Sequence, residues 1–221
     1  MKILKERSSH KVAEYTARRI CNLISDNPET VLILPADKTS LETYQILAKK
    51  SQMRQVSFNK VITFNLDEYI ESEKLHRHMK ENLFSKIDIN LKNVHIPNGK
   101  AKDLKKECLS YEELLARLGP ADLAILGLGI NGHIGFNEPG SEYNSITRVV
   151  DLKTESVKAI TLGIKSILSS KEILLLATGN KKAEIIDKMV HGPITSDVPA
   201  SFLKQHPNTT IVVDFDAGAK L

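Results

Sequence analysis

The chain has few of the residues that mark disulfide-bonded, metal-thiolate or membrane-spanning proteins. Its 221 residues include two cysteines, no tryptophan and only 5% aromatic residues. Cys21 and Cys108 form no C-x-x-C pair, so a redox or metal motif is not expected. We expect both to be reduced thiols of a cytoplasmic protein. The N-terminus soon turns polar and no apolar run is long enough to span a bilayer, so neither a signal peptide nor a membrane partner is expected.

A large excess of one charge is also lacking, which weakens the case for nucleic-acid binding. The chain has 31 basic and 27 acidic residues, a formal net charge of +4, and no long basic run. With so few aromatic residues beside them, we expect no nucleic-acid partner, whereas an anionic small ligand fits the mild excess. The composition, 41% hydrophobic and 26% charged, is that of a folded globular protein. The length suits a single α/β domain over residues 1–221.

Short apolar segments alternate along the chain with amphipathic segments of helical period. Several of the apolar segments have no polar interruption, as expected for parallel strands that are covered on both faces. This alternation predicts an α/β fold with an open, mostly parallel, doubly wound (Rossmann-like) sheet and helices on both faces. The predicted strands are Val31–Leu34, Val61–Phe64, Val94–Ile96, Leu123–Leu128, Ala159–Leu162, Ile173–Ala177 and Thr210–Val213.

Polar residues follow four of these strands, at the edge where open parallel sheets bind ligands. They come directly after Leu34, Phe64, Leu128 and Ala177. Helices are predicted from the periodicity and from capping residues. The predicted helices run from Ser8 or Ser9 to about Ile24, from a Ser40 cap through Leu47, and over Leu104–Leu118 and Lys181–Val190.

The segment Asp122–Gly140, DLAILGLGINGHIGFNEPG, has the glycine spacing G-x-G-x-x-G directly after a strand. A dinucleotide-binding turn has this spacing, but it also requires a helix that opens at the last glycine. Here further glycines, asparagine and proline follow, which disfavour a helix. We therefore interpret the segment as a catalytic loop, in which glycines let the backbone approach a ligand and His133 moves a proton with Glu138 beside it. A structural His133 with a solvated Glu138 is the alternative.

The second polar cluster is Asp67 and Glu68 in VITFNLDEYI, directly after a predicted strand. Adjacent carboxylates in such a place often form only a solvated turn. If one of them is held near the sheet edge with little water, its pKa rises and it becomes a candidate general base. Such a base can remove a proton next to a carbonyl group, which is the central step of aldose–ketose isomerisation.

These segments resemble the glucosamine-6-phosphate deaminase and galactosamine-6-phosphate isomerase family over nearly the whole chain. VITFNLDEY is similar to the family's strand and carboxylate pair, and LGLGINGHIGFNEPG to its signature loop. AITLGIKSIL, LLLATGNKKAEII and VPASFLKQHPNTTIVVD follow in the family's order. The resemblance implies an isomerase and deaminase that converts glucosamine 6-phosphate, a small sugar phosphate, to fructose 6-phosphate and ammonia. It also implies that no metal and no organic cofactor is used.

The resemblance further implies roles for single residues. Asp67 matches the carboxylate that moves a proton between C2 and C1, His133 the base that opens the sugar ring, and Glu138 the acid that supports it. Asn131 stands where family members have Asp or Asn, and it is counted with the catalytic residues. Lys182 matches a lysine that contacts the phosphate. The full set of expected substrate-binding residues is Lys38, Thr39, Ser40, Gly129, Gly132 and Lys182.

The chain departs from the family where the phosphate is held. PADKTS replaces a threonine-glycine-glycine turn, so Asp37 is expected to repel a phosphate and Lys38 to attract one. The segment after DEYI is short, and so is the one between Thr154 and Ala159, which lacks the family's phosphate-binding arginine. Arg148 matches an effector-binding position of some members. Alternatives therefore stay open: a galactosamine-6-phosphate isomerase, a 6-phosphogluconolactonase-type hydrolase, or a catalytically weak sugar-phosphate-binding homologue, as a monomer or a homo-oligomer.

Overall fold

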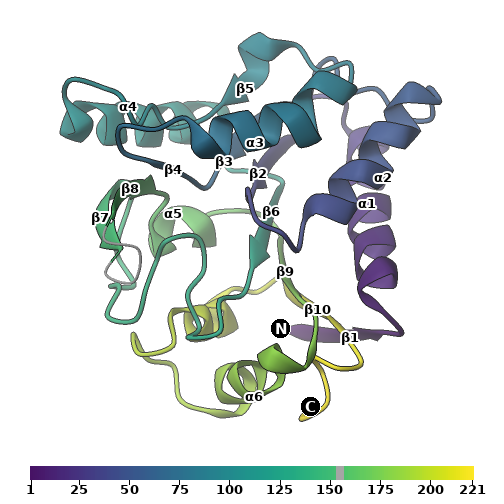
Figure 1. Ribbon diagram of the computed structural model, residues 1–221, viewed down its shortest axis with the longest axis vertical. Coiled ribbons are helices and arrows are strands. Elements are labelled where there is room, and N and C mark those ends of the chain that lie inside the picture. The colour runs from purple at the N-terminus through teal and green to yellow at the C-terminus, as the bar shows by residue number, and fades with distance from the viewer. Residues whose placement is uncertain (153–156) are drawn as a thin grey trace.

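The structure, a computed structural model, describes residues 1–152 and 157–221 and has a parallel sheet at its centre (Figure 1). This sheet has seven strands in the order β1-β10-β9-β6-β2-β3-β5, and each neighbouring pair is parallel. The predicted open, doubly wound sheet is confirmed. In chain order its strands are β1 (Lys2–Glu6), β2 (Val31–Leu34), β3 (Ile62–Asn65), β5 (Val94–His95), β6 (Leu123–Gly127), β9 (Ile173–Ala177) and β10 (Thr209–Asp214).

Helices cover both faces of the sheet, as the apolar strands require. Alternate side chains of β9 enter two separate hydrophobic clusters, because successive side chains of a strand point to opposite faces. Leu174 and Leu176 pack in the cluster that contains residues of the first three helices, whereas Leu175 packs in the cluster of the last three. The helices are α1 (Ser9–Asp26), α2 (Leu41–Gln52) and α3 (Lys74–Asn82), then α4 (Leu104–Leu118), α5 (Ile164–Leu168) and α6 (Ala183–His191).

A second, three-stranded sheet lies beside the main one. It consists of β4 (Asp67–Tyr69), β8 (Val157–Thr161) and β7 (Arg148–Leu152), in that spatial order and with antiparallel pairing. The predicted strand at Ala159–Leu162 is confirmed as β8, but it belongs to this smaller sheet. Only Leu66 separates β3 from β4, so the chain passes from one sheet to the other within a single residue. Asp67 therefore lies at the junction of the two sheets.

Two predicted helix caps have different outcomes. Ser8 caps α1 as predicted, because its side chain accepts a hydrogen bond from the Lys11 amide. Ser40 stands at the predicted N-cap position, directly before α2, but its hydroxyl makes no capping bond there. Instead, the Ser40 amide donates to Oδ1 of Asp37 over 2.9 Å. The prediction that the Ser40 side chain caps this helix is therefore wrong. The side chain that accepts a backbone hydrogen bond at this turn is the carboxylate three residues earlier.

Candidate active site

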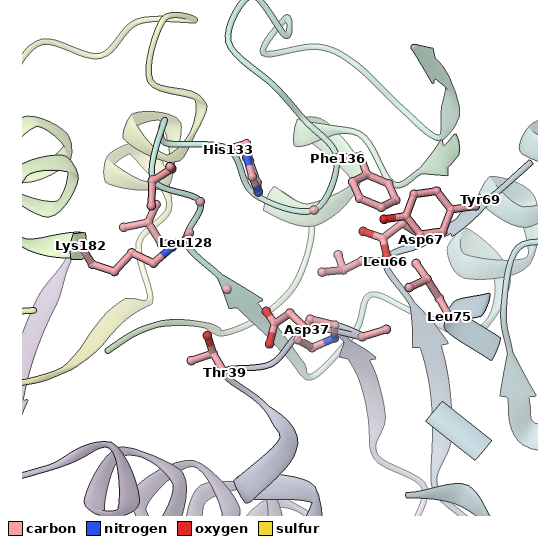
Figure 2. A pocket seen from close by; sticks show the side chains of 16 residues that line it. Asp37, Thr39, Leu66, Asp67, Tyr69, Leu75, Leu128, His133, Phe136 and Lys182 are labelled. Atoms are coloured by element: carbon pink, nitrogen blue, oxygen red, sulfur yellow. Dashed lines mark hydrogen bonds between the residues drawn. The ribbon is translucent and has the colours of Figure 1, made fainter. Parts of the chain in front are cut away.

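A pocket of about 400 Å³ opens at the carboxyl ends of β2, β3 and β6 (Figure 2). This is the edge of the sheet at which the sequence predicts ligand binding. Its titratable lining residues come from four separate segments, and Figure 2 shows Asp37, Asp67 and His133 facing one shared space. The lining residues are Pro35, Ala36, Asp37, Thr39, Leu66, Asp67, Tyr69, Leu75, Gly127, Leu128, Gly129, Ile130, His133, Gly135, Phe136 and Lys182.

Asp67 is the buried carboxyl group of the pocket. It follows β3 and is only 7% exposed, because β4 pairs with β8 at this point and removes it from water. Burial, followed by the charges of Asp37 and Glu68, raises the pKa of Asp67 to about 8. A carboxyl group with a pKa near neutrality is suited to accept and return a proton, whereas an ordinary aspartate is a much weaker base.

Glu68 points away from the pocket and has a structural task. It is 1% exposed, and its carboxylate accepts three backbone hydrogen bonds. Two come from the start of α3, from the amides of Leu75 at 3.1 Å and His76 at 2.7 Å, and one comes from Tyr69 at 2.8 Å. The negative charge also suits the positive end of the helix. Of the adjacent carboxylates, one thus faces the pocket and the other holds α3, whose Leu75 forms part of the pocket wall.

The glycine-rich segment after β6 forms a loop and not a helix. Gly132 has φ of +89° and Gly135 φ of +55°, values that favour glycine. The buried amide of Asn137 holds the loop by donating to the carbonyl groups of Ile134 at 3.0 Å and Leu162 at 2.8 Å. The interpretation of this segment as something other than a dinucleotide-binding turn is therefore confirmed, because that turn needs a helix here.

Two glycines of this loop have separate tasks. Gly129 lines the pocket and leaves room for the imidazole, because a Cβ atom there would lie 2.4 Å from Nδ1 of His133. Gly132 is buried against Val198 and Ile185 and does not line the pocket. The geometry places Gly129 against a proposed catalytic side chain and Gly132 at a tight backbone packing point.

His133 contacts two of the other predicted catalytic residues. Its Nδ1 lies 3.4 Å from Oε1 of Glu138, whose Oε2 accepts a hydrogen bond of 2.5 Å from the amide of Asn131. Asn131 in turn accepts from the backbone N–H of His133 over 3.1 Å. Glu138 and Asn131 line a neighbouring cavity, whereas His133 reaches the pocket itself. A carboxylate at this distance stabilises an imidazolium ion when the ring takes up a proton.

The predicted phosphate-binding residues are only partly brought together. Thr39 and Lys182 line the pocket, but Lys38 is exposed and Ser40 is buried outside the lining. Lys182 precedes α6, and its Nζ donates to the carbonyl oxygen of Leu128 over 2.5 Å. Burial lowers the pKa of Lys182, and the charge of Asp37 opposes that shift. Lys182 is thus the cation of the pocket lining, and Asp37 is within its electrostatic reach.

The sequence did not single out the aromatic wall of the pocket. Tyr69 and Phe136 lie on its side next to Asp67, with ring centroids 5.2 Å apart (Figure 2). Both lie within segments that the sequence analysis identified, DEYI and GFNEPG. Their closeness in sequence to the predicted polar site residues was the one feature that could have indicated a place in the pocket. An apolar wall of this kind excludes water from the Asp67 side of the pocket and sustains its raised pKa.

Arg148, at the predicted effector position, is engaged within the chain. Its guanidinium donates to Oδ1 of Asn137 at 2.8 Å and to the hydroxyl of Ser141 at 3.2 Å. It thereby ties β7 to the loop that follows β6. The predicted short segment from Thr154 lies partly outside the described residues. Within residues 1–152 and 157–221, no group of three or more His, Cys, Asp or Glu is arranged to hold a metal ion. No helix of this described part is long and apolar enough to cross a lipid bilayer.

Comparison with known proteins places these features in a family. Residues 4–212 match the family model described as glucosamine-6-phosphate isomerases/6-phosphogluconolactonase. A glucosamine-6-phosphate deaminase of Oceanobacillus iheyensis is 41% identical over 97% of this chain and 94% of its own length. Another, from Clostridium novyi, is 38% identical over the full length of both chains.

Solved structures share the fold. A structure of a monomeric glucosamine-6-phosphate deaminase superposes with a TM-score of 0.96 at 37% sequence identity, and the match covers 100% of both chains. A 6-phosphogluconolactonase from Thermotoga maritima superposes with a TM-score of 0.80 at 24% identity, over 96% of this chain and 97% of that one. The second likeness concerns the fold alone.

Proposed function

The chain belongs to the family of glucosamine-6-phosphate isomerases and 6-phosphogluconolactonases, and we propose that it converts glucosamine 6-phosphate and water to fructose 6-phosphate and ammonia. Relatives about 40% identical over nearly their whole length bear the name of this deaminase. The observation that carries the proposal is that Asp67 and His133 face one pocket. Opening a sugar ring and moving a proton between neighbouring carbons require two separate proton carriers, and the pocket supplies both.

In the first step, His133 opens the sugar ring. Its imidazole takes the proton of the hydroxyl on C1 and delivers a proton to the ring oxygen as the bond between C1 and that oxygen breaks. Glu138 stabilises the positive charge that forms on the imidazole of His133, since the two groups are 3.4 Å apart and a carboxylate favours an imidazolium ion. Asn131 holds Glu138 in place by its hydrogen bond to the other carboxylate oxygen.

In the second step, Asp67 moves a proton from C2 to C1 of the open chain. The ionised carboxylate removes the proton on C2 while the aldehyde oxygen is protonated, which gives an enolamine. Return of the proton to C1, as the amino nitrogen forms a double bond to C2, leaves an iminium ion at C2 and keeps the hydroxyl group on C1. Water then adds to C2, and ammonia and a proton leave as the C2 carbonyl group forms. The same group can accept and return the proton because its pKa, about 8, lies close to neutrality.

The rest of the pocket positions the substrate. We infer that Lys182 and Thr39 bind the phosphate at the side of the pocket away from Tyr69 and Phe136. The reaction as written balances with water alone, so the proposal includes no metal and no organic cofactor. Lys38, Ser40 and Gly132 are left without a direct substrate contact in this arrangement, and any effect of Lys38 is limited to its charge at the pocket rim.

The proposal is tested by assaying ammonia and ketose phosphate together. The purified chain is incubated with glucosamine 6-phosphate, galactosamine 6-phosphate or 6-phosphogluconolactone in parallel. Equal amounts of ammonia and fructose 6-phosphate from the first substrate are expected. Turnover of galactosamine 6-phosphate only would move the assignment to that isomerase, and hydrolysis of the lactone only would move it to the lactonases. Tight binding of glucosamine 6-phosphate with no product would identify a binding protein.

We further propose that the protein acts as a monomer in the cytoplasm. The monomer is supported by the structure of the monomeric deaminase, which this chain matches over its full length. The cytoplasmic location stays a prediction, which fractionation of cells that contain the tagged protein would test.

A further inference from the structure

The turn between β2 and α2 has the backbone of an anion site, and the side chain of Asp37 fills it. Amide groups at the start of a helix favour a negative charge. Here the Ser40 amide donates to Oδ1 of Asp37 over 2.9 Å, and the Thr39 amide is close enough to oppose the rise that burial causes in the pKa of this carboxyl group. The negative group that the turn holds is therefore part of the protein.

The carboxylate of Asp37 lies between the ends of β2 and β6. It lies against Gly127, the last residue of β6, where a Cβ atom would be only 1.9 Å from Oδ2. Any side chain larger than that of glycine would push the carboxylate out of the pocket. The two residues thus form one arrangement, in which Gly127 on β6 makes room for an acid from the turn after β2.

The charges of the pocket also count against a second anion. Among the described residues that line it, Lys182 is the only lysine or arginine, while Asp37 and Asp67 are both acids. Burial raises the pKa of Asp37 and lowers that of Lys182, and the charge of each residue opposes the shift of the other. A phosphate that binds beside Lys182 is repelled by the carboxylate of Asp37, which already interacts with Lys182 and with the amide of Ser40.

We propose that Asp37 is a specificity-determining residue that competes with the substrate's phosphate for the turn before α2 and for Lys182. This inference rests on the proposed function for its phosphorylated substrate. Asp37 weakens the binding of glucosamine 6-phosphate and leaves the binding of unphosphorylated glucosamine nearly unchanged. The preference for the phosphorylated sugar is therefore small in this protein, and removal of one carboxylate enlarges it. Ring opening and proton transfer stay with His133 and Asp67.

The test measures binding without turnover. Asp67→Asn protein is compared with Asp67→Asn/Asp37→Asn protein by calorimetry, because the first change prevents both product formation and titration of Asp67. The asparagine at position 37 keeps an oxygen that accepts the Ser40 amide, so the turn is preserved. The ligands are inorganic phosphate, glucosamine 6-phosphate and glucosamine. Removal of the like charge is expected to tighten binding of the first two about tenfold, with glucosamine changed less than about twofold.

A matched control separates a local effect from a change in net charge. Glu42 lies in the first turn of the same helix and binds His10 over 2.6 Å outside the pocket. Glu42→Gln in the same Asp67→Asn background removes the same charge and should leave phosphate binding nearly unchanged. The proposal is overturned if Asp37→Asn tightens phosphate less than about threefold, or if Glu42→Gln has the same effect. Equal tightening of glucosamine would also overturn it.

The result is distinguishable from a failure of the proposed function. If the wild-type chain produces fructose 6-phosphate and Asp37→Asn leaves phosphate binding unchanged, the inference on Asp37 falls and the function stands. If Asp37→Asn tightens inorganic phosphate but the wild-type chain turns over no hexosamine phosphate, Asp37 still controls the anion site and the deaminase assignment falls.

Discussion

Asp67 combines deep burial with the position that proton transfer requires, so it is the first residue to test. Asp67→Asn keeps the size and the polarity of the side chain but cannot accept a proton. Loss of a general base typically slows a reaction by about 10² to 10⁴-fold. We expect a loss of this size in kcat for glucosamine 6-phosphate, with KM nearly unchanged, in steady-state measurements of ammonia release. A variant with more than about half of the wild-type kcat would exclude Asp67 as the base.

The raised pKa of Asp67 predicts an unusual pH dependence. The base works only when ionised, so kcat/KM should rise with pH and level off above a pKa of about 8. Asp37→Asn removes a neighbouring negative charge and should move this inflection to lower pH. The pH–rate profiles of the wild-type and variant proteins measure both effects. Inflections that coincide would show that the charge of Asp37 does not reach Asp67.

The same pKa has a consequence for folding stability with a defined sign. An aspartate is ionised above pH ~4 in the unfolded chain but only above about 8 in the folded one. The folded state therefore binds more protons between these values, and its free energy of unfolding falls as pH rises through that range. Asp67→Asn removes this contribution, so the melting temperatures of variant and wild type should diverge in favour of the variant toward alkaline pH.

His133 can be separated from Asp67 by the substrate that is offered. Only the cyclic sugar needs ring opening, so His133→Gln should slow the cyclic sugar phosphate more than an analogue fixed in the open-chain form. The glutamine lacks a group that titrates near neutrality, although it fills much of the same space beside Gly129. Rates with both substrates measure the difference. A matching loss on the two would assign His133 to loop structure and not to ring opening.

How much of the site follows from the sequence depends on the residue. Asp67, His133 and Lys182 follow predicted strands, so their convergence on one pocket could be expected from the topology of parallel sheets. That Glu68 points away from the pocket could not be expected, because its direction depends on the pairing of β4 with β8, far away in the sequence. The contact of Asp37 with Gly127 was also hidden, since it joins the ends of two strands separated by ninety positions of chain.

At the scale of single elements, α3 is the clearest case of a helix that its local sequence conceals. Its segment is mostly polar, and Leu75 and Met79 are its buried residues. Glu68, in the strand that precedes the helix, adds stability because it accepts hydrogen bonds from the amides at the helix start. The strand β1 was missed for a related reason, since it is short, largely exposed and pairs only at the sheet edge with β10. Strands with uninterrupted apolar residues, such as β2 and β9, were predicted with their correct limits.

The contact of Glu68 with α3 predicts a stability effect. Glu68→Gln leaves one oxygen to accept the bonds that two oxygens now accept, and it removes the charge at the helix start. An unmade buried hydrogen bond costs about 1–3 kcal/mol, so the free energy of unfolding should fall by about this amount. Denaturant unfolding measures the loss, and hydrogen exchange should show faster exchange in α3.

A matched control for Glu68 is available at the same helix end. Glu73 precedes α3 directly, is exposed and pairs with Lys100 over 3.0 Å. Glu73→Gln removes an equal charge near the same amides but leaves the bonds of Glu68 intact, so it should hardly change the unfolding curve. Equal losses in the two variants would mean that charge at the helix start, and not the buried contacts of Glu68, stabilises α3.

For the whole molecule, the alternation of apolar and amphipathic segments was enough to predict the layers and the parallel sheet. It was not enough to predict that the chain divides its strands between two sheets. Ala159 and Ile160 of this strand are apolar and point to opposite sides of the pleat, so the pattern fits a central parallel strand as well as β8. Its assignment depends on β4 and β7, which are short or partly exposed and give weak signals of their own.

The last prediction concerns the oligomeric state of this chain. A structure of a monomeric glucosamine-6-phosphate deaminase matches this chain over its full length, so we expect a monomer. Exposed large hydrophobic residues such as Met53, Leu91 and Phe215 lie on different elements, whereas an obligate interface gathers apolar residues into one patch. Light scattering after size exclusion should therefore give the mass of one chain, 24.6 kDa, at all protein concentrations tested. Specific activity should not change on dilution. A multiple of that mass, together with activity lost on dilution, would show that the site depends on assembly.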